Sequence, residues 1–180
     1  MAAVCFVMNI DGGIHEVPLP EGVPGHLWLC GKHKVGPDHA AILEETPADV
    51  IVCLTQRHEL EDRYPAYAQW LVGKPAEARW FPIHDLNAPD VETFVALIDE
   101  IANLLRHNKS VVVHCAAGIG RAGTTAVGVL MRLGMDEHQA LEHVAAHRPM
   151  AGPEAGSQRM VIHDLAQRIA SGHETDSSQP

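Results

Sequence analysis

The sequence predicts one α/β domain built on a central, mostly parallel β-sheet that is flanked by helices. Short runs of β-branched residues alternate along the chain with segments of helical periodicity, the pattern of a parallel sheet with crossover helices. The 180 residues are 46% hydrophobic, which suits one domain with a full core. We therefore expect a single domain over residues 1–170 and a disordered polar tail over residues 171–180.

Three strands and two helices are expected in the first half of the chain. Asp38 is a suitable N-cap, and Pro65 occupies the first helical position, which proline favours. Gly73 and Pro75 should end the second helix, because neither residue continues a helix well. Apolar runs bounded by turn residues indicate the strands. The expected elements are strands at residues 3–8, 26–29 and 49–54 and helices at residues 39–45 and 65–72.

The second half is predicted to contain two strands and four helices. Apolar residues recur at helical spacing between residues 91 and 105, as in an amphipathic helix that packs on a sheet. Asp136 is suited to begin a later helix, which ends at Arg148 and Pro149. The expected elements are strands at residues 79–81 and 111–113 and helices at residues 91–107, 122–133, 136–148 and 157–170.

A short loop after the strand at residues 111–113 carries the chemistry that this sequence suggests. Its two glycines let the backbone curl so that successive N–H groups point inward and can bind a tetrahedral oxyanion. A cysteine that precedes a helix N-terminus and lies near an arginine is stabilised as the thiolate, so Cys115 is the candidate nucleophile. Arg121 can hold two phosphate oxygens in a planar fork. The candidate phosphate-binding residues are Ala116, Ala117, Gly118, Ile119, Gly120 and Arg121.

The pattern His-Cys-x5-Arg after a hydrophobic strand resembles the signature of the cysteine-dependent protein phosphatases, both tyrosine-specific and dual-specificity. The resemblance implies a protein-tyrosine-phosphatase-like fold and hydrolysis through a cysteinyl-phosphate intermediate, with no metal and no cofactor. The implied substrate is a phosphorylated protein or peptide that carries phosphotyrosine and/or phosphoserine or phosphothreonine. His114 would have a structural role beside the cysteine. A Cys-His pair of the protease type is the rival interpretation, but it gives no reason for the glycine loop or for Arg121.

The leaving oxygen of a phosphate ester needs a proton, which a carboxylic acid elsewhere in the chain can supply. The segment 81–90 follows a strand, contains two prolines and ends at a helix, which suits a mobile flap. Dual-specificity phosphatases carry their general acid in a similar Pro-Ile-x-Asp stretch about thirty residues before the cysteine, and Asp85 matches that position. Asp90 is the alternative, although it directly precedes the helix at residues 91–107 and is better suited to cap it.

Weaker similarities cover about residues 25–168 and resemble the kinase-associated phosphatase branch of the dual-specificity family. The matching segments are Cys30-Gly31-Lys32, His58-Glu59-Leu60 and Pro82-Ile83. Gln158 lies near the position where some family members carry a water-orienting glutamine. A surface position on the last helix is the alternative interpretation of Gln158.

One residue departs from the family pattern. Most members have serine or threonine directly after the arginine, where the hydroxyl donates a hydrogen bond to the departing sulfur, whereas this chain has Ala122. The phosphatases of regenerating liver resemble it in this alanine, and Thr124 or Thr125 is a candidate substitute donor. A slow-turnover phosphatase fold that binds a phosphorylated partner is therefore one alternative function. A phosphoinositide phosphatase is another, although such enzymes usually have basic residues in the loop, which is apolar here.

The composition argues against several classes of partner. The formal net charge is −10 and no Lys/Arg cluster is present, so we expect neither nucleic acid nor a membrane surface as a partner, and we expect a monomer. Four cysteines in a chain of this length do not suggest a disulfide framework, and the first residues lack the basic segment of a signal peptide. No apolar run reaches about 18 residues. A cytoplasmic location is the expectation.

Two further features are less specific. His143 and His147 lie four residues apart on one helix, which allows a zinc pair, but solvated helix histidines are more frequent and no metal is expected. A reactive thiolate is readily oxidised to sulfenic acid, which a second thiol can capture. A protective disulfide from Cys115 to Cys53, or to Cys30, is therefore a further hypothesis.

Overall fold

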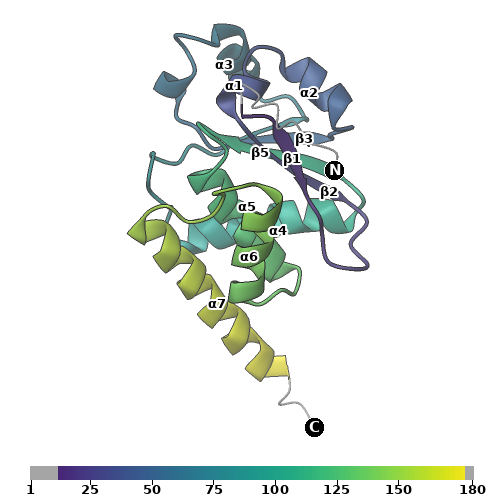
Figure 1. Cartoon of the computed structure of the whole chain (residues 1–180), viewed down its shortest axis with the longest axis vertical. Helices are drawn as coiled ribbons and strands as arrows, with labels where there is room; N and C mark the ends of the chain where they lie inside the picture. The colour runs from purple at the N-terminus through teal and green to yellow at the C-terminus, as the bar shows by residue number, and fades with distance from the viewer. Residues whose placement is uncertain (1–11, 177–180) are drawn as a thin grey trace, which may run out of the picture.

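Five strands and seven α-helices make up residues 12–176, the part of the chain that the computed structural model describes (Figure 1). The strands are β1 (Ile14–Val17), β2 (His26–Gly31), β3 (Val50–Cys53), β4 (Ala78–Trp80) and β5 (Ser110–Cys115). The helices are α1 (Lys32–Val35), α2 (His39–Glu45), α3 (Pro65–Val72), α4 (Val91–Arg106), α5 (Gly120–Arg132), α6 (Glu137–His147) and α7 (Gly156–Asp176), and a 3₁₀ turn, η1, covers Arg57–Glu59.

The strands form one mixed sheet in the order β1-β2-β5-β3-β4. β1 is antiparallel to β2, and all the other pairs are parallel. β5 lies in the centre, paired on both edges and buried at all six positions, which explains its nearly continuous apolar run. The prediction of a central, mostly parallel sheet flanked by helices is confirmed. This topology places Cys115, the last residue of β5, at the middle of the carboxyl edge of the sheet.

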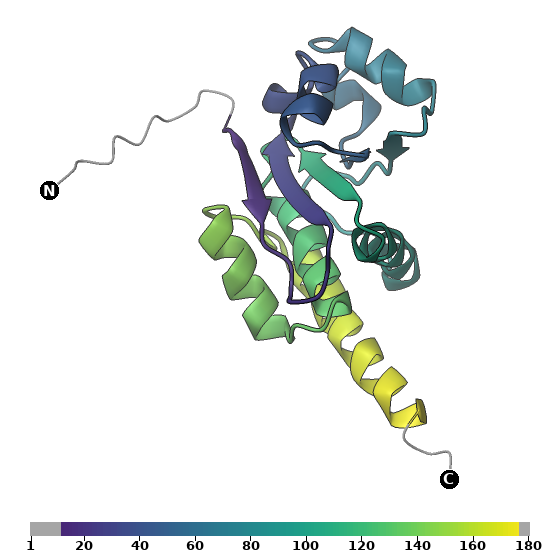
Figure 2. The ribbon, with the colours of Figure 1, turned by 90° about the vertical axis from the view of Figure 1, so that its right-hand side faces the viewer.

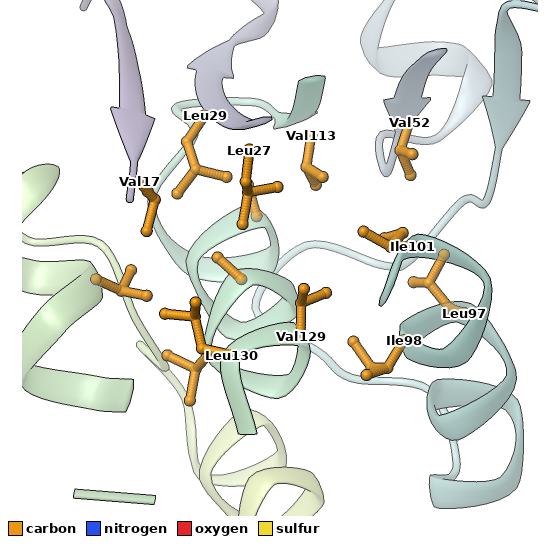
Figure 3. Close-up of a cluster of buried hydrophobic side chains, with 14 of the residues drawn as sticks. Val17, Leu27, Leu29, Val52, Leu97, Ile98, Ile101, Val113, Val129 and Leu130 are labelled. Atoms are coloured by element: carbon orange, nitrogen blue, oxygen red, sulfur yellow. The ribbon is translucent and has the colours of Figure 1, made fainter. Parts of the chain in front are cut away.

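The sheet separates two hydrophobic cores. On one face, α4, α5, α6 and α7 pack against side chains of the strands, among them Leu27, Leu29 and Val113 (Figure 3). On the other face, α1, α2 and α3 cover a smaller core that includes Ile51 and Val112 (Figure 1). α7 runs beside α5 and extends away from the sheet (Figure 2). Successive side chains of β5 point to opposite faces of the sheet, so they pack alternately into the two cores.

Most helix boundaries follow local sequence signals. Asp38, Asp90 and Asp136 each accept a hydrogen bond from the backbone N–H three residues on, so all three are N-caps. α3 begins at Pro65 and ends before Gly73, as predicted. None of the helices between residues 12 and 176 combines the length and the apolar character needed to cross a bilayer.

Several elements differ from the expectation. β1 was not predicted, because a four-residue segment with two polar residues becomes a strand only by pairing with β2. The one-turn helix α1 was also missed, and the strand expected at residues 3–8 lies outside the described residues. α7 continues to Asp176, so the expected tail is helical over residues 171–176. A single glycine, here Gly172, costs a helix only about 1 kcal/mol relative to alanine and does not end it.

Candidate active site

The loop between β5 and α5 turns its backbone donors and acceptors to opposite sides. The carbonyl oxygens of residues 116–119 all accept hydrogen bonds from other backbone N–H groups or side chains, namely from Lys32 N, from Arg148 Nη2 and Nε, and from Gly152 N. The backbone N–H groups of residues 116–121 have no acceptor among the described residues. Unpaired N–H groups at a helix N-terminus form an anion-binding site. The predicted oxyanion site would need unpaired donors of this kind.

Arg148 holds this loop in shape and was not recognised in the sequence. Its side chain is buried and donates to Gly118 O at 2.6 Å and to Ala117 O at 2.8 Å. The same guanidinium reaches Leu29 O at 3.3 Å and His15 Nδ1 at 2.6 Å. Burial and the charge of Arg148 lower the pKa of His15, which favours the neutral ring that can accept this bond. In the sequence, Arg148 is only a polar residue at a helix end, which carries no signal for this role.

The two glycines of the loop differ in how strictly the fold requires them. Gly118 has φ +73°, and a Cβ atom there would lie 2.3 Å from Cys30 O. A Cβ atom on Gly120 would lie 2.0 Å from the Glu154 carboxylate. The contact at Gly118 is with backbone, so any larger residue there would distort the loop. At Gly120 the exposed end of the Glu154 side chain can move away from an added Cβ atom.

Arg121 lies in the first turn of α5, and its guanidinium is almost fully buried. Nη1 and Nη2 form a two-pronged ion pair with Glu59, each at 2.8 Å, and Nη1 also donates to Ile83 O at 2.9 Å. Nη2 lies 3.1 Å from Asp85 Oδ1, and Nε has no partner among the described residues. Burial opposes the charged form, but the hydrogen bonds that Arg121 donates to Glu59 and the nearby charges of Cys115, Glu59 and Asp85 raise the pKa of Arg121. Glu59, quoted in the sequence only for a weak resemblance, is therefore part of the site.

The structure brings Asp85 to the loop and leaves Asp90 at the start of α4. The Asp85 side chain is 68% exposed, and its carboxylate contacts Arg121. Asp90 accepts hydrogen bonds from the Thr93 backbone N–H at 3.0 Å and from the Thr93 hydroxyl at 2.7 Å. These bonds lower the pKa of Asp90 and favour its ionised form. Of the two candidates, only Asp85 contacts Arg121, while Asp90 caps α4.

Cys115 and His114 point to opposite faces of the sheet. Cys115 is 3% exposed and joins the core on the α5 face. His114 is fully buried, and burial lowers its pKa to about 4, so its ring is neutral. Burial also raises the pKa of Tyr67, whose O–H stays protonated and donates to His114 Nε2 at 2.7 Å. The remaining ring proton is then on Nδ1, which lies 3.4 Å from Cys115 O. This contact gives His114 a structural place beside the cysteine.

The buried neutral His114 should make folding sensitive to acid. The unfolded chain binds a proton at His114 below pH about 6.5, whereas the folded chain binds it only below about 4. Between these values the unfolded state holds more protons, so we expect the free energy of unfolding to fall by about 3 kcal/mol as the pH drops through this window. Urea unfolding at several pH values measures this. His114→Asn should lose that part of the pH dependence, and an identical dependence in both proteins would contradict the prediction.

Neither threonine of α5 donates to the Cys115 sulfur. Thr125 Oγ1 donates to Arg121 O at 2.9 Å, and Thr124 Oγ1 lies 3.4 Å from Gln158 Oε1. Within residues 12–176, no hydroxyl hydrogen-bonds the sulfur, and Ala122 stands buried where the family donor would be. The hypothesis that one of these threonines substitutes for the missing donor is therefore not supported.

Gln158 is buried, so its interpretation as a surface helix residue is wrong. Its Oε1 accepts from Glu154 N at 2.8 Å, and its Nε2 donates to Asn87 O at 3.2 Å. The side chain therefore ties the start of α7 to the segment that carries Asp85. The sequence offered no sign of burial, because the residues on either side of Gln158 are polar.

The side chains of Cys30 and Cys53 and the histidine pair of α6 have other surroundings than the loop. Cys30 and Cys53 belong to the core on the face opposite Cys115, so a disulfide to either would need the backbone to move. Burial raises the pKa of Cys53 to about 11. His143 Nε2 bonds to Pro18 O, and His147 Nδ1 bonds to His143 O. In the described part of the chain, no group of three or more metal-binding side chains is present.

Comparisons with known proteins show the family of the chain and its fold. The profile of the family described as "Polymorphic toxin system, DSP-PTPase phosphatase" matches residues 29–135. Dual specificity protein phosphatase 1 of Arabidopsis thaliana is 42% identical over 69 residues, which are 38% of this chain and about a third (35%) of that protein. The structure of Tk-PTP in its active form has a TM-score of 0.65 at 26% identity and covers 86% of this chain and 97% of its own. Kinase associated phosphatase shares the fold, with a TM-score of 0.71 at 20% identity over 88% and 96% of the two chains.

Proposed function

Because the chain belongs to the DSP-PTPase phosphatase family, we propose that it hydrolyses phosphotyrosine and/or phosphoserine or phosphothreonine in proteins through a cysteinyl-phosphate intermediate. The observation that carries the proposal is the loop itself. Its unpaired N–H groups at residues 116–121 stand between Cys115 and the buried guanidinium of Arg121. Donors placed where a phosphoryl group gains charge are the largest source of stabilisation in such reactions, and they need no metal or cofactor.

In the first step, the Cys115 thiolate attacks phosphorus, so an S–P bond forms while the bond to the leaving oxygen breaks. The loop N–H groups and Arg121 hold the three equatorial oxygens. Asp85 gives its proton to the leaving alcohol or phenol. In the second step, Asp85 takes a proton from water, the water oxygen attacks phosphorus, and the thiolate leaves.

The contacts of Arg121 support a coupled role for Asp85. Nε is free among the described residues, whereas Nη2 is engaged by Asp85 and Glu59. A bound phosphate can take Nε and replace Asp85 at Nη2, which completes the planar fork that arginine offers to two oxygens. The released carboxyl group then stands beside the phosphoryl group. Glu59 keeps the guanidinium in place throughout, which makes it a positioning residue.

The missing hydroxyl at Ala122 should slow the second step. We expect a burst of phenol approaching one equivalent when the protein is mixed with an aryl phosphate, followed by slower turnover. Ala122→Ser restores a hydrogen-bond donor worth ~1–3 kcal/mol and should raise kcat roughly 10- to 100-fold, with kcat/KM nearly unchanged. Stopped-flow and steady-state kinetics measure both effects.

The matched control is Ala126→Ser, which adds the same hydroxyl to another fully buried alanine of α5. It should leave the burst as it is in the unmodified chain. If the unmodified chain shows no burst and Ala122→Ser leaves kcat unchanged, hydrolysis of the intermediate does not limit the reaction.

A panel of substrates tests the proposed function against its alternatives. Steady hydrolysis of an aryl phosphate and of phosphopeptides is the expected result, and the peptides give the preference among phosphotyrosine, phosphothreonine and phosphoserine. A single burst without turnover would favour a binding module for a phosphorylated partner. Release of phosphate from phosphoinositides alone would favour the lipid phosphatase.

We propose that the protein works as a monomer in the cytoplasm. A cysteine nucleophile has to remain reduced, and the reducing cytoplasm keeps thiols in that form. The net charge of −10 opposes binding to nucleic acid and to anionic membranes, so the proposed partner is a phosphorylated protein or peptide.

A further inference from the structure

A groove of about 680 Å³ lies along the β4 edge of the sheet, between η1 and α3, and we call it the edge groove. Its apolar walls include Leu71, Trp80 and Pro82. The indole of Trp80 is half-buried and held by a hydrogen bond from Nε1 to Thr55 O at 2.8 Å. The edge groove is therefore a preformed surface with an apolar wall that does not swing freely.

The basic side chains that line the edge groove leave one positive charge without a partner in the described part of the chain. Arg57, Lys74 and Arg79 line it, and none of the described residues in its lining is acidic. Arg57 and Arg79 each already hold one carboxylate outside the groove. Lys74 is exposed and has no ion-pair partner within residues 12–176. In a chain of net charge −10, this placement leaves a local site for a carboxylate.

Two short connections link the edge groove to the candidate active site. Gln56 lines the groove, and its backbone N–H donates to Glu59 Oε2 at 2.8 Å, the same oxygen that binds Arg121. Pro82 lines the groove three residues before Asp85. Because an extended chain rises about 3.3 Å per residue, Pro82 and Asp85 are at most about 10 Å apart along the backbone. A peptide with its phosphate in the loop therefore reaches the Pro82 end of the groove after about three residues, and the rest of the groove follows from there.

We propose that the edge groove binds the substrate segment beside the phosphorylated residue and selects an acidic side chain two to four residues away from it. This inference rests on the proposed function and adds a substrate preference to it. The apolar wall contacts the aliphatic part of the segment, and Lys74 pairs with its carboxylate. Because the contact is made by an exposed lysine, the preference acts mainly through KM and weakens at high salt.

The test compares phosphopeptides that differ only at these positions, where they carry Glu, Gln or Lys on either side of the phosphorylated residue. We expect a several-fold higher kcat/KM for the Glu peptide than for the Gln peptide, and a lower value for the Lys peptide. Lys74→Gln should remove this order, and Lys74→Glu should reverse it. Neither variant should change turnover of a small aryl phosphate, which does not reach the groove.

Lys109→Glu provides the same change of charge far from the groove, because Lys109 precedes β5 at the end of the sheet opposite Cys115. Unlike Lys74, it is paired with Asp49, so the folding of this variant is checked first. The ratio of kcat/KM for the Glu peptide to kcat/KM for the Gln peptide decides the outcome. If Lys74→Glu leaves this ratio unchanged, the edge groove proposal is overturned. The same holds if Lys109→Glu changes the ratio as much as Lys74→Glu does. If the unmodified protein hydrolyses no phosphate ester, the proposed activity fails, and the groove is tested separately. Calorimetry with Cys115→Ser then measures the affinities of the same peptides, and equal affinities for the Glu and Gln peptides would overturn the groove.

Discussion

Replacement of Cys115 by serine is expected to lower kcat for every phosphate ester on the order of 10⁴-fold or more, while inorganic phosphate still binds. The serine hydroxyl is not ionised at neutral pH, so the nucleophile is lost. The loop N–H groups and Arg121 remain, because their positions depend on Arg148, Gly152 and Glu59 and not on the sulfur. Steady-state kinetics and calorimetry with inorganic phosphate measure the two properties.

Cys53→Ser is the matched control for loss of a thiol. Cys53 is buried on the opposite face of the sheet, so this variant should keep its activity as long as it folds. Turnover that persists in Cys115→Ser would refute the cysteinyl-phosphate mechanism. Loss of phosphate binding in the same variant would show that the sulfur also organises the loop.

Asp85→Asn is expected to lower kcat for a phosphopeptide roughly 10²- to 10⁴-fold and to have a much smaller effect on an activated aryl phosphate. A poor leaving group needs the proton that Asp85 supplies, whereas a good one leaves without it. The decline of activity at high pH, which deprotonation of the general acid causes, should disappear in this variant. Rates with both substrates across the pH range give the comparison.

The control is Asp90→Asn, because asparagine also caps a helix and keeps α4 in place. It should leave both rates and the high-pH decline as they are. Inhibition by inorganic phosphate separates the two roles of Asp85. Loss of its carboxylate removes one of the two partners of Arg121 Nη2 and should not weaken phosphate binding. If Asp90→Asn abolishes the high-pH decline and Asp85→Asn does not, the assignment of the acid is wrong.

Features that depend on neighbouring residues could be predicted from the sequence. An N-cap oxygen accepts a hydrogen bond from the N–H three residues on. The starts of α2, α4 and α6 could therefore be predicted from Asp38, Asp90 and Asp136. The central strand β5 could be predicted as well, because a strand buried on both faces needs apolar residues at nearly every position. The loop at residues 116–121 and its place after that strand are contiguous in the chain, so the candidate nucleophile and arginine could be named.

Contacts between distant segments were decided only by the tertiary structure. Glu59 pairs with Arg121 across 62 residues, and Arg148 reaches back 30 residues to Gly118, although nothing near either residue in the sequence indicates its partner. The short strand β1 likewise exists through its pairing with β2. Such contacts form where the fold brings buried charges and unpaired backbone groups together, and a buried polar group that lacks a partner is costly. The sequence by itself therefore determined the loop at residues 116–121 and its strand, while the folded chain decided which charged side chains hold that loop in shape.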